Sequence, residues 1–153
     1  MPHRVLILCT GNCVRSQMAE GLLRQLGGSS YEAHSAGSKP NGYISGLAIE
    51  AMRKIGIDLS WHRSKSVAEF EGQKFDTVIT VCDSAAEECP VFLGSQRIHW
   101  SIWDPGNAKG SYEEKLAAFC RIRDELASRL RQFLDDRGHP DGVATESLDP
   151  LRF

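Results

Sequence analysis

VLILCTGNCVR, residues 5–15, decides the fold of this chain. The apolar run that ends at Cys9 is typical of a short buried strand, and a turn containing Gly-Asn follows it. The spacing C-x5-R lets the backbone curl around an oxyanion with its N–H groups pointing inward, while the Arg15 guanidinium closes the ring. The pattern predicts an oxyanion-binding loop with a sulfur nucleophile at its base. The residues expected to surround the anion are Thr10, Gly11, Asn12, Cys13, Val14, Arg15 and Ser16.

The same loop should make Cys9 reactive. Inward N–H dipoles, the positive end of a helix that starts at Ser16, and the Arg15 charge all favour a thiolate over a thiol. The alternative is that Cys9 is only a small apolar residue at a strand end. The ATP-binding pattern G-x-x-x-x-G-K-S/T is absent from the sequence, so nucleotide phosphates are not the default ligand.

Bulk properties exclude several functions. The chain has 153 residues, a net charge of −2 and a pI near 6.2, and its basic residues are scattered, so binding to nucleic acid or an anionic membrane is not expected. Its longest apolar run is too short for a membrane span or a secretory signal, and we expect a cytoplasmic protein. Its five cysteines include no C-x-x-C pair. This count predicts reactive thiols rather than a disulfide framework, and no zinc or other metal site.

Strand and helix patterns alternate along the chain. Strands are expected at 4–9, 31–35, 75–82 and 97–102, and helices at 16–26, 45–55 and 111–133. Alternation of this kind predicts an α/β fold, a three-layer sandwich with a central four-stranded parallel sheet. Residues 1–134 should form a single catalytic domain, and the polar, turn-rich residues 135–153 a flexible tail.

Three chemically capable side chains lie at or just past predicted strand ends: Cys9, Cys82 and Asp104. Ligands of parallel sheets bind at this edge, so the three should meet there. Asp104 precedes Pro105, which stiffens its loop, and it is the natural general acid for an oxygen leaving group. The alternative is a solvated turn residue.

Cys82 and Cys89 decide between two chemistries. A phosphatase that uses Cys9 as its nucleophile needs neither thiol. A reductase needs both, because As(V) bound to a thiolate is reduced when a second thiol attacks the first sulfur, and exchange can pass from Cys9 to Cys82 to Cys89. Residues 83–91, a loop-like or marginally helical segment, would then rearrange during turnover. Alternatively, Cys82 is a core residue and Cys89 a loop thiol.

Several short motifs resemble the thioredoxin-coupled arsenate reductases, which share the low-molecular-weight protein tyrosine phosphatase fold. They are CTGN at 9–12, RSQMAEG at 15–21, SAG at 35–37, Cys82, Cys89-Pro90, His99-Trp100 and Asp104-Pro105. The resemblance implies that Cys9 is the nucleophile, Arg15 the oxyanion clamp and Asp104 the general acid. It also implies that Cys82 and Cys89 form a thiol shuttle reduced by thioredoxin. Gln17 in place of proline, and Gly106 in place of tyrosine, favour the reductase over its phosphatase relatives.

The sequence departs from the family at two positions. Cys13 is displaced by one position from a common family cysteine, so it is either a packing residue or a redox partner of Cys9. Lys65 stands where some members use an acidic residue to hold a monovalent cation, together with residues that match Asn12, Glu20 and Ser35. We expect the Lys65 ammonium to replace that cation and pair with Glu20. The alternative is that Lys65 is a solvated charge on a loop.

The sequence thus predicts a monomeric, cytoplasmic arsenate reductase without a tightly bound cofactor, with thioredoxin as electron donor and phosphate or sulfate as competing oxyanions. Two alternatives remain open. One is a low-molecular-weight phosphatase that hydrolyses phosphomonoesters. The other is a non-enzymatic redox or oxyanion sensor.

Overall fold

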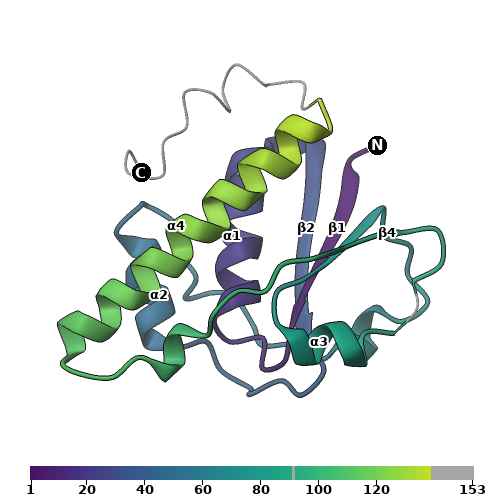
Figure 1. The fold of residues 1–153 in the computed structure, drawn as a ribbon. Coiled ribbons are helices and arrows are strands. Elements are labelled where there is room, and N and C mark those ends of the chain that lie inside the picture. The colour runs from purple at the N-terminus through teal and green to yellow at the C-terminus, as the bar shows by residue number, and fades with distance from the viewer. Residues whose placement is uncertain (91, 139–153) are drawn as a thin grey trace.

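A parallel sheet of four strands in the order β2-β1-β3-β4 forms the centre of the molecule (Figure 1). The structure, a computed structural model, describes residues 1–90 and 92–138. The strands are β1 (His3–Cys9), β2 (Tyr31–Gly37), β3 (Thr77–Thr80) and β4 (Gln96–His99). Cys9 pairs with Gly37, and Leu8 with Thr80. This register brings the carboxyl ends of β1, β2 and β3 to one edge of the sheet.

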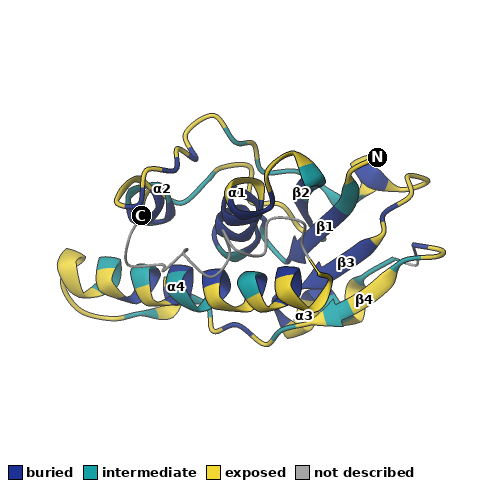
Figure 2. Ribbon diagram, turned by 90° about the horizontal axis from the view of Figure 1, so that it is seen from above, coloured by how far each residue is buried: buried dark blue, intermediate teal, exposed yellow. Residues whose placement is uncertain are grey.

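Three helices lie on one side of the sheet (Figure 2). They are α1 (Arg15–Gly27), α2 (Gly46–Arg53) and α4 (Tyr112–Asp136), and α1 packs on β1 and β2 while α4 packs across α1 and α2. α1 buries Met18 and Leu22 completely, as its apolar stripe predicts. α4 begins with the expected capping box, in which the Ser111 hydroxyl accepts from the Glu114 N–H at 3.1 Å.

The opposite face is covered by shorter elements. These are α3 (Asp83–Glu88) and the 3₁₀ turn η2 (Val67–Phe70). Elsewhere, two further 3₁₀ turns lie in connecting segments: η1 (Gly28–Ser30) and η3 (Pro105–Asn107). Leu8 of β1 borders a crevice with Val67 and Ala85, and Phe75 makes edge-to-face contacts with Phe70 and Phe92. Both faces of the sheet are therefore covered, and the predicted α/β sandwich with four parallel strands is confirmed.

The later strands are shorter than predicted. The sequence predicts strands at 75–82 and 97–102, but β3 ends at Thr80 because Cys82 is the N-cap of α3. The backbone beyond both strands still pairs, since Val81 donates to the Leu8 carbonyl at 2.9 Å and Trp100 to the Thr80 carbonyl at 2.8 Å. The apolar runs in the sequence therefore did not indicate where β3 and β4 end.

The boundary with the expected tail also differs. α4 continues to Asp136, so the first two residues of the segment 135–153 are helical. Residues 139–153 of that segment lie outside the described residues. Within residues 1–90 and 92–138, no helix combines the length and the apolar character needed to cross a membrane.

Packing of α4 should dominate the stability of this core. Leu126 of α4 is fully buried, so Leu126→Ala should lower the free energy of unfolding by about 2–5 kcal/mol through lost burial and a residual cavity. Leu93→Ala is the matched control because Leu93 is 86% exposed, and it should change stability by less than about 0.5 kcal/mol. Urea denaturation measures both. Equal midpoints for the two variants would contradict this account of the core.

Candidate active site

A tight loop of residues 10–14 joins the carboxyl end of β1 to the first turn of α1. Gly37 lies so close to this loop that a Cβ there would collide with the Thr10 carbonyl oxygen. Asn12 has φ of 47°, and it is the only non-glycine residue with a positive φ in the part of the chain that the structure describes. Asparagine tolerates this left-handed conformation better than most residues do. The loop therefore depends on the residue types at positions 12 and 37.

The buried side chain of Asn12 holds the loop in place. Its Nδ2 donates to Ser16 Oγ at 2.8 Å and to Ser35 Oγ at 3.0 Å. Its Oδ1 accepts from Gln17 Nε2 at 2.9 Å and from the Lys65 backbone N–H at 2.8 Å. Both protons and both lone pairs of the amide are used, which fixes its orientation. Asn12 therefore ties α1, β2 and the segment around Lys65 to one loop conformation.

The Cys9 sulfur lies in close contact with a serine hydroxyl. Cys9 Sγ lies 2.8 Å from Ser16 Oγ. Because the Ser16 oxygen already accepts a proton from Asn12, its own proton is available to the sulfur. The N-cap residue of α1, Val14, provides no side-chain cap, so the first N–H groups of the helix remain available to an anion. The reactivity of Cys9 stays a prediction from the sequence.

A cavity of about 370 Å³ opens above the loop. Its walls include the expected Cys9, Thr10, Gly11, Cys13, Val14, Arg15 and Asp104, together with Lys39 and Asn41. The sequence reasoning missed Lys39 and Asn41. They follow β2 directly, and a position just past the end of a parallel strand was the signal that could have identified them. Lys39 adds a second positive charge to the cavity.

Arg15 and Asp104 lie together at this cavity, as predicted. Arg15 Nη1 donates to the Ile102 carbonyl at 2.9 Å, and its Nη2 lies 3.7 Å from Asp104 Oδ2. The other carboxylate oxygen of Asp104 accepts from the Gly106 N–H at 2.9 Å. The Ile102 carbonyl thus orients the guanidinium, and the turn after Asp104 orients the carboxyl group. Both groups face the space in which an anion would sit.

Cys82 lies beside the anion loop, at the start of α3, whereas Cys89 lies at the other end of α3. Cys82 Sγ is 3.3 Å from the hydroxyl of Thr10, the residue after Cys9. Cys89 follows the last residue of α3 and borders a narrow crevice with Leu8 and Ala85. Seven residues of helical rise separate the two cysteines by about 10 Å along the axis, which exceeds the span of roughly 7 Å that a disulfide bridges.

The remaining cysteines differ in position. Cys13 lines the same cavity as Cys9, and its Sγ accepts from Asn41 Nδ2 at 3.0 Å. Burial raises the pKa of the Cys13 thiol, and the Asn41 hydrogen bond only partly offsets this. Cys13 thus lines the cavity and also packs against the hydrophobic core, which are the positions that its two interpretations require. Cys120 is half-buried on α4, where Arg123 Nη1 contacts its sulfur at 3.5 Å, and it does not line the cavity.

An ion cluster lies next to the loop. Lys65 Nζ is 3.7 Å from Glu20 Oε1, which also accepts from Ser35 Oγ at 2.6 Å, and Arg24 and His62 approach Oε2 at 2.9 and 3.4 Å. Burial raises the pKa of Glu20, but Lys65, Ser35, His62 and Arg24 together outweigh burial and lower it. Burial lowers the pKa of Lys65, and Glu20 opposes that shift. Lys65 therefore occupies the place beside Glu20 that the sequence analysis gave it.

Gln17 connects this cluster to the loop. It is fully buried, and its Nε2 donates to the Asn12 carbonyl, to Asn12 Oδ1 and to the Arg63 carbonyl. Its Oε1 contacts His62 Nδ1 at 2.9 Å. The sequence analysis used Gln17 only as a difference from the phosphatases. Its structural role is to bridge the anion loop and residues 62–63.

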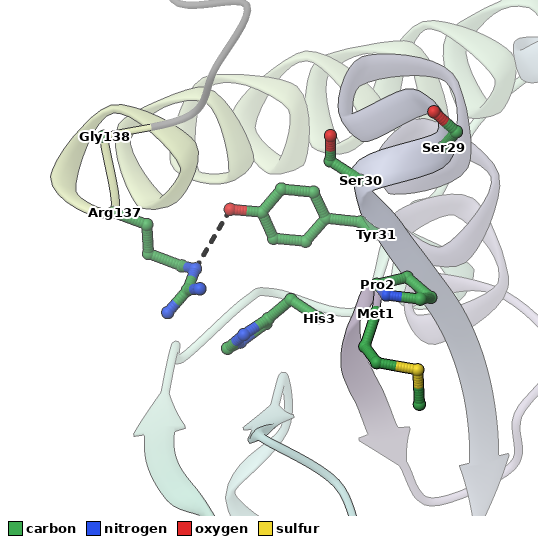
Figure 3. Close-up of a pocket in the computed structure, with 8 residues that line it drawn as sticks. All are labelled: Met1, Pro2, His3, Ser29, Ser30, Tyr31, Arg137 and Gly138. Carbon is green, nitrogen blue, oxygen red and sulfur yellow. Dashed lines mark hydrogen bonds between the residues drawn. The ribbon is translucent and has the colours of Figure 1, made fainter.

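A second hollow, of about 560 Å³, lies at the opposite end of the sheet, where β1 begins (Figure 3). His3, Tyr31 and Arg137 line it, and Arg137 Nε donates to the Tyr31 hydroxyl at 3.0 Å. No cysteine borders it. Residues 1–90 and 92–138 hold no group of three or more metal-ligating side chains. This hollow therefore lies away from the cavity that Cys9, Arg15 and Asp104 border.

Comparisons with known proteins indicate the family of this chain. Residues 4–140 match the family model described as low molecular weight phosphotyrosine protein phosphatase. The arsenate reductases of Halalkalibacterium halodurans and Bacillus subtilis are 41% and 40% identical to this chain over 132 residues, which cover 86% of it and 94% of each relative.

Solved structures show the same fold. One described as an arsenate reductase in the phosphate-binding state has a TM-score of 0.75 and 26% identity, covering 88% of this chain and 98% of that one. A thioredoxin-dependent arsenate reductase of Corynebacterium glutamicum has a TM-score of 0.70 and 28% identity, covering 88% of this chain and 61% of that one. A low molecular weight protein tyrosine phosphatase from T. tengcongensis has a TM-score of 0.73 and 26% identity, covering 88% and 99%.

The Ser16 hydroxyl should account for part of the Cys9 reactivity. Ser16→Ala removes the hydrogen bond to the sulfur, so labelling of Cys9 by iodoacetamide at neutral pH should slow about tenfold, as expected for a lost bond to a charged group. Peptide mass spectrometry follows the labelling. The control is Ser128→Ala on the exposed face of α4, which should label at the wild-type rate. An unchanged rate in Ser16→Ala would show that Ser16 does not stabilise the thiolate.

Proposed function

Because the chain belongs to the low molecular weight phosphotyrosine protein phosphatase family, and within it to the arsenate reductases, we propose that it reduces arsenate to arsenite. The observation that carries the proposal is the position of Cys82, a second thiol against the loop that holds the nucleophile. A phosphatase of this fold has no use for that thiol. Cys9, Cys82 and Cys89 would act in sequence as a relay.

The first step is capture of arsenate in the Cys9 cavity. Loop N–H groups and the Arg15 guanidinium bind its oxygens, and the Cys9 thiolate attacks arsenic. One oxygen leaves as water when Asp104 supplies a proton, and an S–As(V) bond remains. Phosphate and sulfate have the same shape and charge, and should therefore compete with arsenate.

The second step transfers two electrons. The Cys82 thiolate attacks Cys9 Sγ, an S–S bond forms, and the electron pair of the S–As bond stays on arsenic, which leaves as arsenite. Cys89 then attacks Cys82, which releases the Cys9 thiolate and forms the Cys82–Cys89 disulfide. This bond cannot form across an intact α3, so residues 83–88 must unwind.

A dithiol protein closes the cycle by reducing the Cys82–Cys89 disulfide. Thioredoxin is the proposed donor, and the thioredoxin-dependent relative of the same fold supports this assignment. The reaction as written needs no bound cofactor. We also propose that the protein acts as a monomer in the cytoplasm, where thiols are kept reduced.

Phosphomonoester hydrolysis is the second candidate function. The anion loop, Arg15 and Asp104 are the parts that such a reaction needs, and the match to the phosphatase family model supports it. It would use Cys9 as nucleophile and water to clear the intermediate, without Cys82 or Cys89.

Substitution of Cys82 distinguishes the two functions. In Cys82→Ser, arsenate-dependent NADPH oxidation in the presence of thioredoxin and thioredoxin reductase should fall to background, because the relay thiol that attacks Cys9 and passes the disulfide to Cys89 is absent. Hydrolysis of para-nitrophenyl phosphate should continue in this variant. Cys120→Ser is the control and should keep arsenate reduction at the wild-type rate, because Cys120 does not line the cavity.

Three outcomes of this assay would count against the proposal. Arsenate reduction retained in Cys82→Ser would contradict the relay. Phosphatase turnover without arsenate reduction in the wild type would favour hydrolysis. A single arsenite per protein, with no further turnover in the complete thioredoxin system, would favour the oxyanion or redox sensor.

Potassium should have no effect on this activity. Lys65 supplies a positive charge 3.7 Å from Glu20, so a monovalent cation is not needed beside the loop. Rates of arsenate reduction in sodium and potassium buffers of equal ionic strength should agree within error. A severalfold stimulation by potassium would mean that a cation binds there despite the ammonium of Lys65.

A further inference from the structure

The core holds α3 only weakly. The helix has six residues, of which Ala85 alone is buried, and its N-cap residue Cys82 makes no side-chain capping bond. Helices of this length are marginal without tertiary support. α3 packs on β1 and β3, and polar contacts from β4 and the loop that follows it add to this packing.

Two residues outside α3 bind its first side chain. Asp83 Oδ1 accepts from His99 Nε2 at 2.8 Å and from Ser101 Oγ at 2.7 Å. On its other side, His99 Nδ1 lies 2.7 Å from the hydroxyl of Thr80, its partner in the sheet register. Both ring nitrogens of His99 therefore have a hydrogen-bond partner. The ring thus connects the end of β3 to the start of α3.

A third contact joins the two elements further along α3. Arg97 Nη2 of β4 donates to the carbonyl of Ala86 at 3.1 Å. Together these contacts hold the segment helical while both thiols are reduced. In the helical form Cys89 stays half-buried at the crevice beside Leu8.

We propose that Asp83, His99 and Ser101 form a latch that sets how readily α3 unwinds, and through it the reactivity and reduction potential of Cys82 and Cys89. These are positioning residues, because they act through the helix and touch no substrate. The latch contacts form only when the first turn of α3 has the position that it takes in the dithiol form. A disulfide between Cys82 and Cys89 requires that turn to open. They therefore stabilise the dithiol form over the disulfide form.

The latch keeps the disulfide easy to reduce. A contact present only in the dithiol form raises the reduction potential of the pair, because it must be lost on oxidation. Without it, Cys89 should become accessible more often and the disulfide should become harder to reduce. The effect on potential rests on the proposed function, whereas the effect on accessibility does not.

Ser101→Ala tests the latch without altering the helix itself. In the reduced full-length protein, the rate of Cys89 labelling by iodoacetamide, followed by peptide mass spectrometry, should rise about threefold, as expected for one exposed hydrogen bond. Ser95→Ala is the matched control, because the Ser95 hydroxyl bonds the Phe92 carbonyl and lies before β4. It should label at the wild-type rate.

A double-mutant cycle separates the latch from a general loss of structure. If Ser101 acts through Asp83, Ser101→Ala should have no further effect in an Asp83→Ala background. Equal labelling in wild type and Ser101→Ala, or an undiminished effect of Ser101→Ala in that background, would overturn the latch.

The reduction potential provides the second readout. Equilibration with dithiothreitol buffers should show the Cys82–Cys89 disulfide of Ser101→Ala about threefold more stable than that of the wild type, a shift of about 14 mV to more negative potential. No shift in Ser101→Ala would overturn the effect on potential. Faster labelling of Cys89 in a protein that forms no Cys82–Cys89 disulfide would support the latch and contradict the relay, so the two failures are distinguishable.

Discussion

The hydrogen bonds of the buried Asn12 side chain are the constraint on which the rest of the site depends. Asn12 holds a left-handed backbone in the anion loop, and its amide bonds Ser16, Ser35, Gln17 and the backbone of Lys65. Its donation to Ser16 leaves the Ser16 proton for the Cys9 sulfur. The same side chain couples the nucleophile to the ion pair of Glu20 and Lys65 through Ser35. A buried amide with every position used cannot rotate without leaving a polar group unpaired, so the loop is preorganised before an anion arrives.

The difference between a phosphatase and a reductase on this fold lies outside that loop. Capture of an oxyanion needs the anion loop, Arg15 and Asp104, and both reactions use these groups. Electron transfer needs a second thiol beside the anion loop, which is Cys82, and a third thiol that can reach Cys82, which is Cys89. The helix α3 separates these two thiols by about 10 Å. A helix with one buried residue can open at modest cost, whereas the loop and the sheet remain fixed. The protein thus combines a rigid binding site with a labile segment directly beside it.

The sequence predicted best what is encoded locally. Cys9, Arg15 and Ser16 lie within eight consecutive residues, so their spacing alone indicated the anion loop. Asp104 was identified by its place after a predicted strand. Lys39 and Asn41 escaped notice because they reach the cavity only through the pairing of β2 with β1. Gln17 bridges the loop and residues 62–63, a contact between segments 45 or more residues apart that no local pattern encodes. Likewise, the apolar run through Cys82 did not indicate where β3 ends. The strand ends before Cys82 because this residue is the N-cap of α3, and its sulfur contacts Thr10, which is far away in the sequence.

The most direct test of the account is a single turnover without reductant. Reduced protein is mixed with excess arsenate, quenched in acid with a thiol-blocking reagent, and mapped by peptide mass spectrometry while arsenite is quantified. The relay predicts one arsenite per protein, a disulfide between Cys82 and Cys89, and a blocked, formerly free thiol at Cys9. Arsenite formed together with a disulfide between Cys9 and Cys13, or formed with Cys82 and Cys89 both still free, would contradict it.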